Sequence, residues 1–402
     1  MSLMKSPLSP LSPLSAPAQP TSQRWTWDVF CHVVDNYGDV GVCWRLARDL
    51  AERGHEVRLW LDDPQALTWM APQGHPRVQV VPWPAQGLCL DIEPAQVVIE
   101  AFGCTLPAPY VGRMAQLEHP AVWINLEYLS AEDYVERSHG LPSPQKAPNG
   151  RWLDKWFFFP GLTPRTGGLI REPDLATRRA AFDRDAWLLE LGLRREPGER
   201  VVSLFCYDSA PVKDLVQTLQ HQPTLLLAAP GAAQSLLRHQ THPAVTGAEW
   251  PDRLGQLRCH PLPWLSQRDY DHLLWSADLN FVRGEDSLVR ALWAQVPFIW
   301  HLYPQHDGAH AHKLQAFLAQ MCKSFPDPLA QRVRQFYLHW NGLTPEGNTM
   351  PWNDVFSNNG LQDWQIALVP WLHELLAQED LSRQLTTFVE RRIGPLKLDV
   401  NP

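Results

Sequence analysis

Phe281-Val282-Arg283-Gly284-Glu285-Asp286-Ser287 joins a strand-like run at 277–282 to a helical run at 288–295. Such strand-to-helix junctions are the units from which helix-covered sheets are built. The junction also brings an arginine, free backbone N–H groups and two carboxylates to the start of one helix. Arginine and helix N-terminal amides bind diphosphates, whereas carboxylates repel them. The combination favours a ligand that has both a diphosphate and hydroxyl groups, such as a nucleotide sugar.

Strand-like and helical runs alternate along the chain in two successive series. The first series occupies 28–126, and the second begins with an apolar strand at 201–206. Between them, the sequence predicts a loop at 142–153 and a helix at 175–193. This alternation is typical of parallel sheets with crossover helices, so we expect an α/β fold.

The two series predict two domains. We expect an N-terminal Rossmann-like domain at 25–193 and a C-terminal one at 194–402, which includes helices at 364–376 and 381–393. Ligands of open α/β sheets bind at the carboxyl ends of the strands, so the cleft between the domains is the expected site. Residues 1–24 contain three Ser-Pro-Leu repeats, and proline at this density predicts a disordered tail.

The composition argues against several kinds of partner. A net charge of −8 over 402 residues does not suit nucleic-acid binding, which needs a basic surface. No apolar run approaches the length of a membrane span. The seven cysteines form no CxxC pair, as expected for reduced, buried thiols in a cytoplasmic protein. We expect the protein to be a monomer.

The stretch Asp35-Asn36-Tyr37-Gly38-Asp39 connects the first strand to the first helix. Each aspartate alone has a structural explanation, since Asp39 can cap the helix and Asp35 can form an Asx turn. Two acids beside Gly38 and Gly41 instead favour a turn that a substrate can approach closely. The G-x-G-x-x-G fingerprint is absent, and two anions would repel a pyrophosphate. We therefore expect this turn to bind an acceptor, preferably a cationic one.

Aromatic residues follow strands of the second series and are candidates for a nucleobase site. With one glutamine that can pair with the edge of a base, the candidates are Phe205, Tyr207, Trp264, Gln267 and Tyr270. The alternative for Phe205 and Trp264 is a place in the core. Tyr270 could equally pack its helix against the sheet.

Two further features have simpler explanations. Arg283 would bind the diphosphate, but the alternative is a salt bridge to Glu285 or Asp286. A histidine cluster resembles a metal site and comprises His301, His306, His310 and His312, with Asp307 among them. Because His310 and His312 would point in different directions from one helix, we expect no metal there.

Several segments of the chain resemble one known family. Residues 31–48, CHVVDNYGDVGVCWRLAR, resemble the opening of the elongation factor P arginine rhamnosyltransferases. Residues 157–161 with 166–169 resemble the mid-chain signature of that family, and 283–287 and 303–305 resemble its donor-site segments. The resemblance begins after the Pro/Ser-rich tail and runs to the C-terminus.

The resemblance implies a GT-B fold, in which two Rossmann-like domains face each other across a cleft. Members of the family transfer rhamnose from dTDP-β-L-rhamnose to an arginine of elongation factor P, with inversion and without a metal or other cofactor. The implied catalytic carboxylates are Asp39, the better candidate for the base, Asp35 and Glu285. The implied acceptor-binding residues are Asp35, Asn36, Tyr37, Gly38 and Asp39. The implied donor-binding residues are Phe205, Tyr207, Trp264, Gln267, Tyr270, Arg283, Gly284, Glu285, Asp286 and Ser287.

The residues suit this chemistry. A protonated guanidinium is a poor nucleophile, and paired aspartates can orient it and take a proton as the C–N bond forms. Arg283 and backbone amides can stabilise the leaving diphosphate. Glu285 can hold a sugar hydroxyl or support an oxocarbenium-like transition state. Two other functions remain as alternatives: a GT-B enzyme with another nucleotide sugar and a carbohydrate acceptor, and a non-catalytic translation-factor binding protein.

Overall fold

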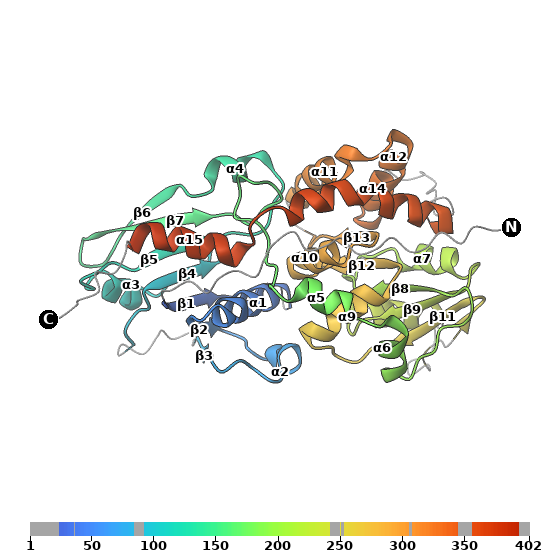
Figure 1. The fold of residues 1–402 in the computed structure, drawn as a ribbon, viewed down its shortest axis with the longest axis horizontal. Coiled ribbons are helices and arrows are strands. Elements are labelled where there is room, and N and C mark those ends of the chain that lie inside the picture. The colour runs from blue at the N-terminus through green and yellow to red at the C-terminus, as the bar shows by residue number, and fades with distance from the viewer. Residues whose placement is uncertain are drawn as a thin grey trace.

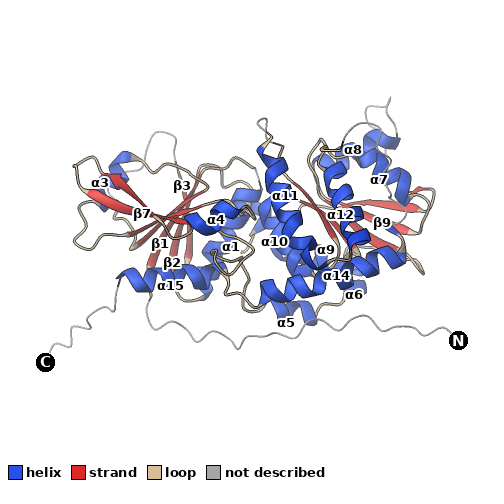
Figure 2. Cartoon of the chain, turned by 90° about the horizontal axis from the view of Figure 1, so that it is seen from above, coloured by secondary structure: helices blue, strands red, loops and turns tan. Residues whose placement is uncertain are grey.

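The computed structural model describes residues 24–35, 37–83, 92–241, 250, 253–304, 308–344 and 356–393. Two lobes lie side by side, and each is built on one sheet with helices packed against it (Figure 1, Figure 2). The predicted disordered tail, residues 1–24, lies outside the described residues except for Arg24.

The first lobe contains a seven-stranded sheet in the order β3-β2-β1-β4-β5-β7-β6, in which only β6 runs antiparallel to its neighbour. Its strands are β1 (Thr26–Cys31), β2 (Glu56–Leu61), β3 (Val78–Pro82), β4 (Val97–Ala101), β5 (Val122–Leu126), β6 (Pro142–Lys146) and β7 (Trp152–Phe158). Val29 of β1 shares a core with α1 (Gly38–Glu52), whereas the adjacent Phe30 shares a core with α3 (Ala108–Met114). Both faces of β1 are therefore buried, as is typical of parallel sheets.

The second lobe contains a six-stranded sheet in the order β10-β11-β9-β8-β12-β13, in which only β10 is antiparallel. Its strands are β8 (Arg200–Leu204), β9 (Thr224–Ala228), β10 (Arg253–Leu254), β11 (Leu257–Pro261), β12 (Leu279–Arg283) and β13 (Phe298–His301). Its helices are α6 (Arg184–Glu190), α7 (Val212–Leu219), α8 (Ala232–Thr241), α9 (Gln267–Ser276), α10 (Gly284–Ala294), α11 (Ala309–Met321), α12 (Asp327–Trp340) and α14 (Asn358–Leu376). Further α-helices of the described residues are α2 (Leu67–Met70), α4 (Asp133–Ser138), α5 (Leu175–Ala180) and α15 (Leu381–Ile393). The predicted α/β alternation is confirmed in both lobes.

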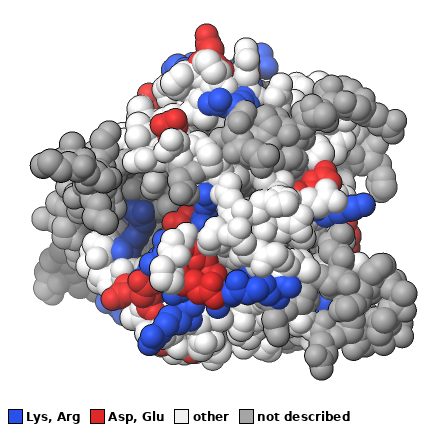
Figure 3. Space-filling view, turned by 90° about the vertical axis from the view of Figure 1, so that its right-hand side faces the viewer, with Lys and Arg blue, Asp and Glu red and all other residues white. Residues whose placement is uncertain are grey.

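The surface of the second lobe carries charges of both signs. Figure 3 shows one end of the molecule, where acidic and basic side chains lie interspersed. Two ion pairs of this lobe are Arg195 with Asp185 and Arg253 with Glu196. Of the helices that the structure describes, none is long and apolar enough to cross a membrane.

The predicted loop at 142–153 is wrong, because most of it forms a β-hairpin between β6 and β7. Proline cannot donate a backbone hydrogen bond, so Pro142 and Pro144 had argued against a strand. They are tolerated because β6 lies at the edge of the sheet and pairs with β7 alone.

The predicted single helix at 175–193 is also wrong, because it is split into α5 and α6. The carboxylate of Asp183 accepts hydrogen bonds from the backbone N–H groups of Asp185 and Ala186, both at 3.0 Å. Asp183 therefore caps a new helix instead of continuing the previous one.

The last helix, α15, returns to the first lobe, as Figure 1 shows. Its apolar stripe of Leu381, Leu385 and Val389 packs into the core of the first sheet. The preceding helix α14 packs in the core of the second lobe. The assignment of all C-terminal helices to a domain at 194–402 is therefore corrected for α15. Spacing alone indicates which face of a helix is apolar, but not which sheet covers it.

A buried ionic network joins the two lobes. Arg45 of α1 donates from Nε to Asp286 Oδ1 at 2.7 Å, and from Nη2 to Asp271 Oδ1 at 3.3 Å. Arg290 of α10 forms a bidentate pair with Asp271, donating from Nε at 2.8 Å and from Nη2 at 2.7 Å. Glu172, from the segment between the sheets, accepts from both Arg45 and Arg290. These charges compensate one another. Burial alone would raise the pKa of Glu172, but the positive charges of Arg290 and Arg45 hold this pKa below its usual range.

The Arg45→Met variant is expected to lose about 3–5 kcal/mol of unfolding free energy, because it leaves buried carboxylates without their partner. Urea denaturation measures this loss. Arg48→Met is the matched control on the same helix, since Arg48 is exposed and pairs with Glu52 one turn away. Its expected loss is below about 1 kcal/mol. Equal losses in the two variants would show that the network does not hold the lobes together.

Candidate active site

The N-terminal ends of α1 and α10 meet at the boundary between the lobes. Gly284 begins α10 with φ of +67°, and a Cβ atom there would lie 2.9 Å from Asp35 Oδ2. A Cβ atom on Gly38 would lie only 2.6 Å from the same oxygen. Both glycines are therefore required for the close approach that places Asp35 against the second lobe.

Asp35 is bound directly by the second lobe. Tyr207, which follows β8, donates a hydrogen bond from Oη to Asp35 Oδ2 at 3.0 Å. Burial, and then the negative charge of Asp35, raise the pKa of Tyr207 above its usual value. The phenol therefore stays protonated and keeps Asp35 oriented at neutral pH.

Asp39 braces the turn that carries Asp35. Its Oδ2 atom accepts hydrogen bonds from the N–H groups of Val34 at 2.8 Å and Asp35 at 3.0 Å. The residue is only 3% exposed, and burial raises its pKa to about 6 against the effect of these two hydrogen bonds. The charges of Asp35 and Glu285 raise the pKa further. Asp39 thus lies within the first turn of α1 and is not its N-cap, which is Tyr37.

Arg283 lies among aromatic rings. Its guanidinium carbon is 4.4 Å from the ring centroid of Tyr207, 4.6 Å from that of Phe205 and 5.5 Å from that of Tyr37. The alternative of a salt bridge to Glu285 or Asp286 is wrong, because within the described ranges Arg283 forms no ion pair with either. Neither carboxylate therefore neutralises its charge, and the Arg283 side chain lines a cavity at the boundary between the lobes.

The two carboxylates that follow Arg283 are both engaged. Asp286 pairs with Arg45, as described above. Glu285 accepts from Lys313 Nζ at 2.6 Å and from the Leu129 N–H at 2.8 Å. The repulsion that these carboxylates would exert on a diphosphate is thus reduced by cations and an amide.

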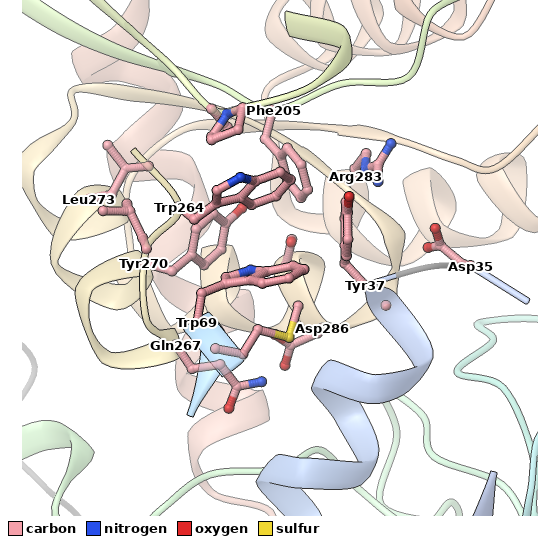
Figure 4. Close-up of a pocket in the computed structure, with 16 residues that line it drawn as sticks. Asp35, Tyr37, Trp69, Phe205, Trp264, Gln267, Tyr270, Leu273, Arg283 and Asp286 are labelled. Carbon is pink, nitrogen blue, oxygen red and sulfur yellow. The ribbon is translucent and has the colours of Figure 1, made fainter. Parts of the chain in front are cut away.

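A smaller cavity lies on one side of Asp35, with a volume of about 80 Å³. Figure 4 shows its aromatic lining, in which the rings of Trp69 and Trp264 lie one above the other. Their centroids are 4.7 Å apart, and Tyr37 packs edge-on against both. Trp264 is 45% exposed, so the alternative of a core residue is wrong for this tryptophan.

The other expected donor residues divide between this cavity and a larger one. The smaller cavity is lined by Phe205, Gln267, Tyr270, Arg283, Asp286 and Ser287. The larger cavity is lined by Tyr207, Gly284 and Glu285. Gln267 has a structural partner as well, since its side-chain amide donates to the Gly41 carbonyl at 2.9 Å and ties α9 to α1. Tyr270 packs edge-on against Phe205.

A larger cavity of about 570 Å³ lies on the other side of Asp35. Its polar lining combines the carboxylates of Asp35, Asp39 and Glu285 with Lys313. Asp35 and Gly38 line both cavities, so they form the boundary between the two. Asn36, expected to bind the acceptor, lies outside the described residues.

The histidine cluster is only partly described. His301 accepts the N–H of Tyr207 at 3.3 Å and is 3.2 Å from Ser209 Oγ. Burial, followed by Arg283, lowers the pKa of His301 to about 3, so it is neutral and supports the end of β13. His306 and Asp307 lie outside the described residues. Within the described ranges, no group of three or more His, Cys, Asp or Glu is arranged to hold a metal ion.

Several residues that line the two cavities are not predicted by the sequence, and these include Trp69, Phe102, Tyr128 and Lys313. None lies in a motif with a recognisable chemical pattern. An unusually high tryptophan content of 19 residues was the one signal that could have pointed to Trp69.

Comparison with known proteins identifies the family. Residues 27–390 match the family described as Elongation-Factor P (EF-P) rhamnosyltransferase EarP. The chain belongs to the EarP family. This membership confirms the resemblance inferred from the motifs, and the fold is the predicted GT-B fold.

Relatives of this EarP-family chain are named protein-arginine rhamnosyltransferase. One from Pseudomonas aeruginosa is 40% identical over 384 residues, which is 90% of this chain and 98% of the relative. One from Pseudomonas putida is 46% identical over 332 residues, or 79% of this chain and 86% of the relative. A solved structure described as the structural basis for EarP-mediated arginine glycosylation of translation elongation factor EF-P has a TM-score of 0.62 and 31% identity. It covers 91% of this chain and 99% of its own chain.

Asp39→Asn is expected to change how stability depends on pH. The pKa of Asp39 is raised from 3.8 to about 6, so the folded state binds its proton more tightly than the unfolded state. The free energy of unfolding of the wild type therefore falls as the pH rises from about 4 to about 7. The asparagine variant has no such proton to lose, so its stability does not fall for this reason. Relative to the wild type, the variant should gain up to about 3 kcal/mol between about pH 4 and about pH 7.

Chemical denaturation at several pH values checks this expectation. Asp63→Asn, at an exposed position in the same lobe, is the control. A stability difference between Asp39→Asn and wild type that does not change with pH would contradict the raised pKa.

Proposed function

We propose that the chain is an inverting protein-arginine rhamnosyltransferase that transfers rhamnose from dTDP-β-L-rhamnose to an arginine of elongation factor P. Elongation factor P and the rhamnosyl group are named in the description of the family, and arginine glycosylation of elongation factor P in the description of the relative's solved structure. The dTDP-linked donor and the inversion rest on the resemblance of the motifs. The reaction is proposed to take place in the cytoplasm, with the enzyme as a monomer and without a metal or other cofactor.

The observation that carries the proposal is the position of Asp35 between two chemically different cavities. On one side lie Arg283 and the aromatic rings, which suit a nucleoside diphosphate. On the other side lie Asp35 and Asp39, which suit a cation, whereas Glu285 is already paired with Lys313. A donor on one side and an arginine on the other would meet at Asp35.

The proposed reaction displaces dTDP from the sugar. A guanidinium nitrogen attacks the anomeric carbon, the C–N bond forms, and the C–O bond to the diphosphate breaks with its electron pair leaving on dTDP. Attack from the face opposite the diphosphate inverts the anomeric carbon. Asp39 accepts the proton that the nitrogen loses, and a pKa of about 6 suits a base near neutral pH. Asp35 orients the guanidinium.

The second lobe would stabilise the leaving group. Arg283 and the backbone N–H groups that begin α10 balance the charge that develops on the diphosphate. Glu285 is held between Lys313 and the Leu129 N–H, so its position is fixed for a sugar hydroxyl or for the positive charge of the transition state.

The thymine ring is expected to stack on Trp264. A base can stack between two aromatic rings only if the two ring planes are roughly 7 Å apart, which is twice the contact distance of carbon atoms. The 4.7 Å between Trp69 and Trp264 is too short for this, so donor binding should move Trp69.

The wild-type protein, with dTDP-β-L-rhamnose and elongation factor P, is expected to add the mass of one deoxyhexose to a single arginine. Intact-protein and peptide mass spectrometry measure this addition. Elongation factor P with lysine in place of that arginine is the control and should stay unmodified. Transfer from UDP-sugars alone would instead favour a GT-B enzyme of different donor specificity, and binding without transfer would favour a translation-factor binding protein.

Asp39→Asn is expected to keep the affinity for dTDP-rhamnose and to lose at least ~10²-fold in turnover, as for the loss of a general base. Steady-state kinetics and calorimetric donor binding measure the two effects separately, with Asp63→Asn as the control. A collapse of donor binding in Asp39→Asn would place Asp39 on the donor side and contradict its assigned role.

A further inference from the structure

A strained turn borders the larger cavity at the end of β4. The Cys104 N–H donates to the Ala101 carbonyl at 3.2 Å and closes a four-residue turn. Both central residues have positive φ, +60° at Phe102 and +69° at Gly103. Left-handed backbone at both positions is the mark of a type I′ turn, which favours Asn or Gly at its first central position. Phenylalanine is unfavourable there, so a gain elsewhere must offset the strain.

The strained turn holds the Phe102 ring in a defined position through two contacts. The Phe102 N–H donates to the Leu126 carbonyl at 2.7 Å, which holds the turn against the end of β5. Its ring stacks on Tyr128 with centroids 4.5 Å apart and an interplanar angle of 16°. Both residues are only half-buried and both line the larger cavity. The turn therefore presents a pair of stacked rings to the site.

Carboxylates line the same cavity as this pair. Asp35, Asp39 and Glu285 line the same cavity. Burial raises the pKa of Tyr128 above its usual range, and the charges of Asp39 and Glu285 raise it further. Aromatic faces attract cations, and nearby carboxylates strengthen that attraction.

The site already holds a cation from its own chain. Lys313 Nζ lies 5.7 Å from the ring centroid of Tyr128 and 5.9 Å from that of Trp300. The same ammonium is paired with Glu285 at 2.6 Å. A combination of ring and carboxylate therefore binds a positive charge in this cavity.

We propose that Phe102 and Tyr128 form an aromatic platform on which the planar guanidinium of the acceptor arginine stacks while Asp35 and Asp39 bind its N–H groups. A planar guanidinium can lie flat on a ring while its forked N–H groups reach two carboxylates, so the platform suits an arginine side chain. The platform rests on the proposed function, since it assigns the subsite of that acceptor.

The Phe102→Leu variant is expected to raise the Kd for elongation factor P about tenfold, the loss of one cation–π contact, while the Kd for dTDP stays unchanged. Calorimetry on the dTDP complex measures acceptor binding without turnover. Tyr128→Leu should behave in the same way, and Tyr128→Phe, which keeps the ring, should bind as the wild type does. Trp152→Leu is the matched control, because Trp152 is 64% exposed and begins β7, away from the carboxyl ends of the strands.

A second variant, Phe102→Asn, separates binding from folding. Asparagine suits the left-handed turn, so its melting temperature should exceed that of Phe102→Leu although it binds elongation factor P as weakly. Weak binding in a well-folded variant is an outcome that a purely structural role of Phe102 does not produce.

The outcomes distinguish the platform from the function on which it rests. Wild-type protein that binds elongation factor P but transfers no deoxyhexose contradicts the proposed function. An unchanged Kd for elongation factor P in Phe102→Leu, or a parallel loss of dTDP affinity, overturns the platform alone. Wild-type protein that neither binds nor modifies elongation factor P overturns both.

Discussion

The arrangement of the two lobes depends on the buried guanidinium of Arg45. It projects from the first helix of one lobe and is bound by carboxylates on two helices of the other and by Glu172 between the sheets. Arg45 is only 5% exposed. Because removing an ion from water costs much free energy, its charge is tolerated only when its hydrogen bonds are satisfied. This requirement gives the two lobes a definite register, in which Asp35 of the first lobe lies beside Tyr207 of the second.

The same pairing explains how acidic residues can lie beside a diphosphate site. Arg45 neutralises Asp286, and Lys313 with a backbone amide neutralises Glu285. Arg283, by contrast, is surrounded by rings and forms no ion pair among the described residues. Positive charge is thus left facing the donor side, and the negative charge of Asp35 and Asp39 is left facing the acceptor side. The cleft is positive on the donor side and negative on the acceptor side because the other charges beside it are paired.

Sequence patterns predicted the α/β fold because buried parallel strands are short apolar runs with turns at their ends. They failed at 142–153, where an edge strand tolerates prolines, and for α15, whose apolar stripe fits either sheet. The turn at Asp35–Asp39 and the junction at 283–287 were identified because each carries its chemistry within a few consecutive residues. Trp69 and Phe102 were missed because only the tertiary structure brings them to the cavities.

The return of α15 to the first lobe means that the chain passes between the lobes twice. Arg171, on the first passage, donates hydrogen bonds to the carbonyls of Leu376 and Gln378 on the second, at 2.8 and 2.9 Å. The two passages therefore lie side by side and are fastened together. Two bodies joined at adjacent points can swing apart about those points but cannot slide freely past each other. The two adjacent passages therefore resist sliding of the lobes, as the buried pairs of Arg45 do across the boundary, and both restraints keep Asp35 beside Tyr207.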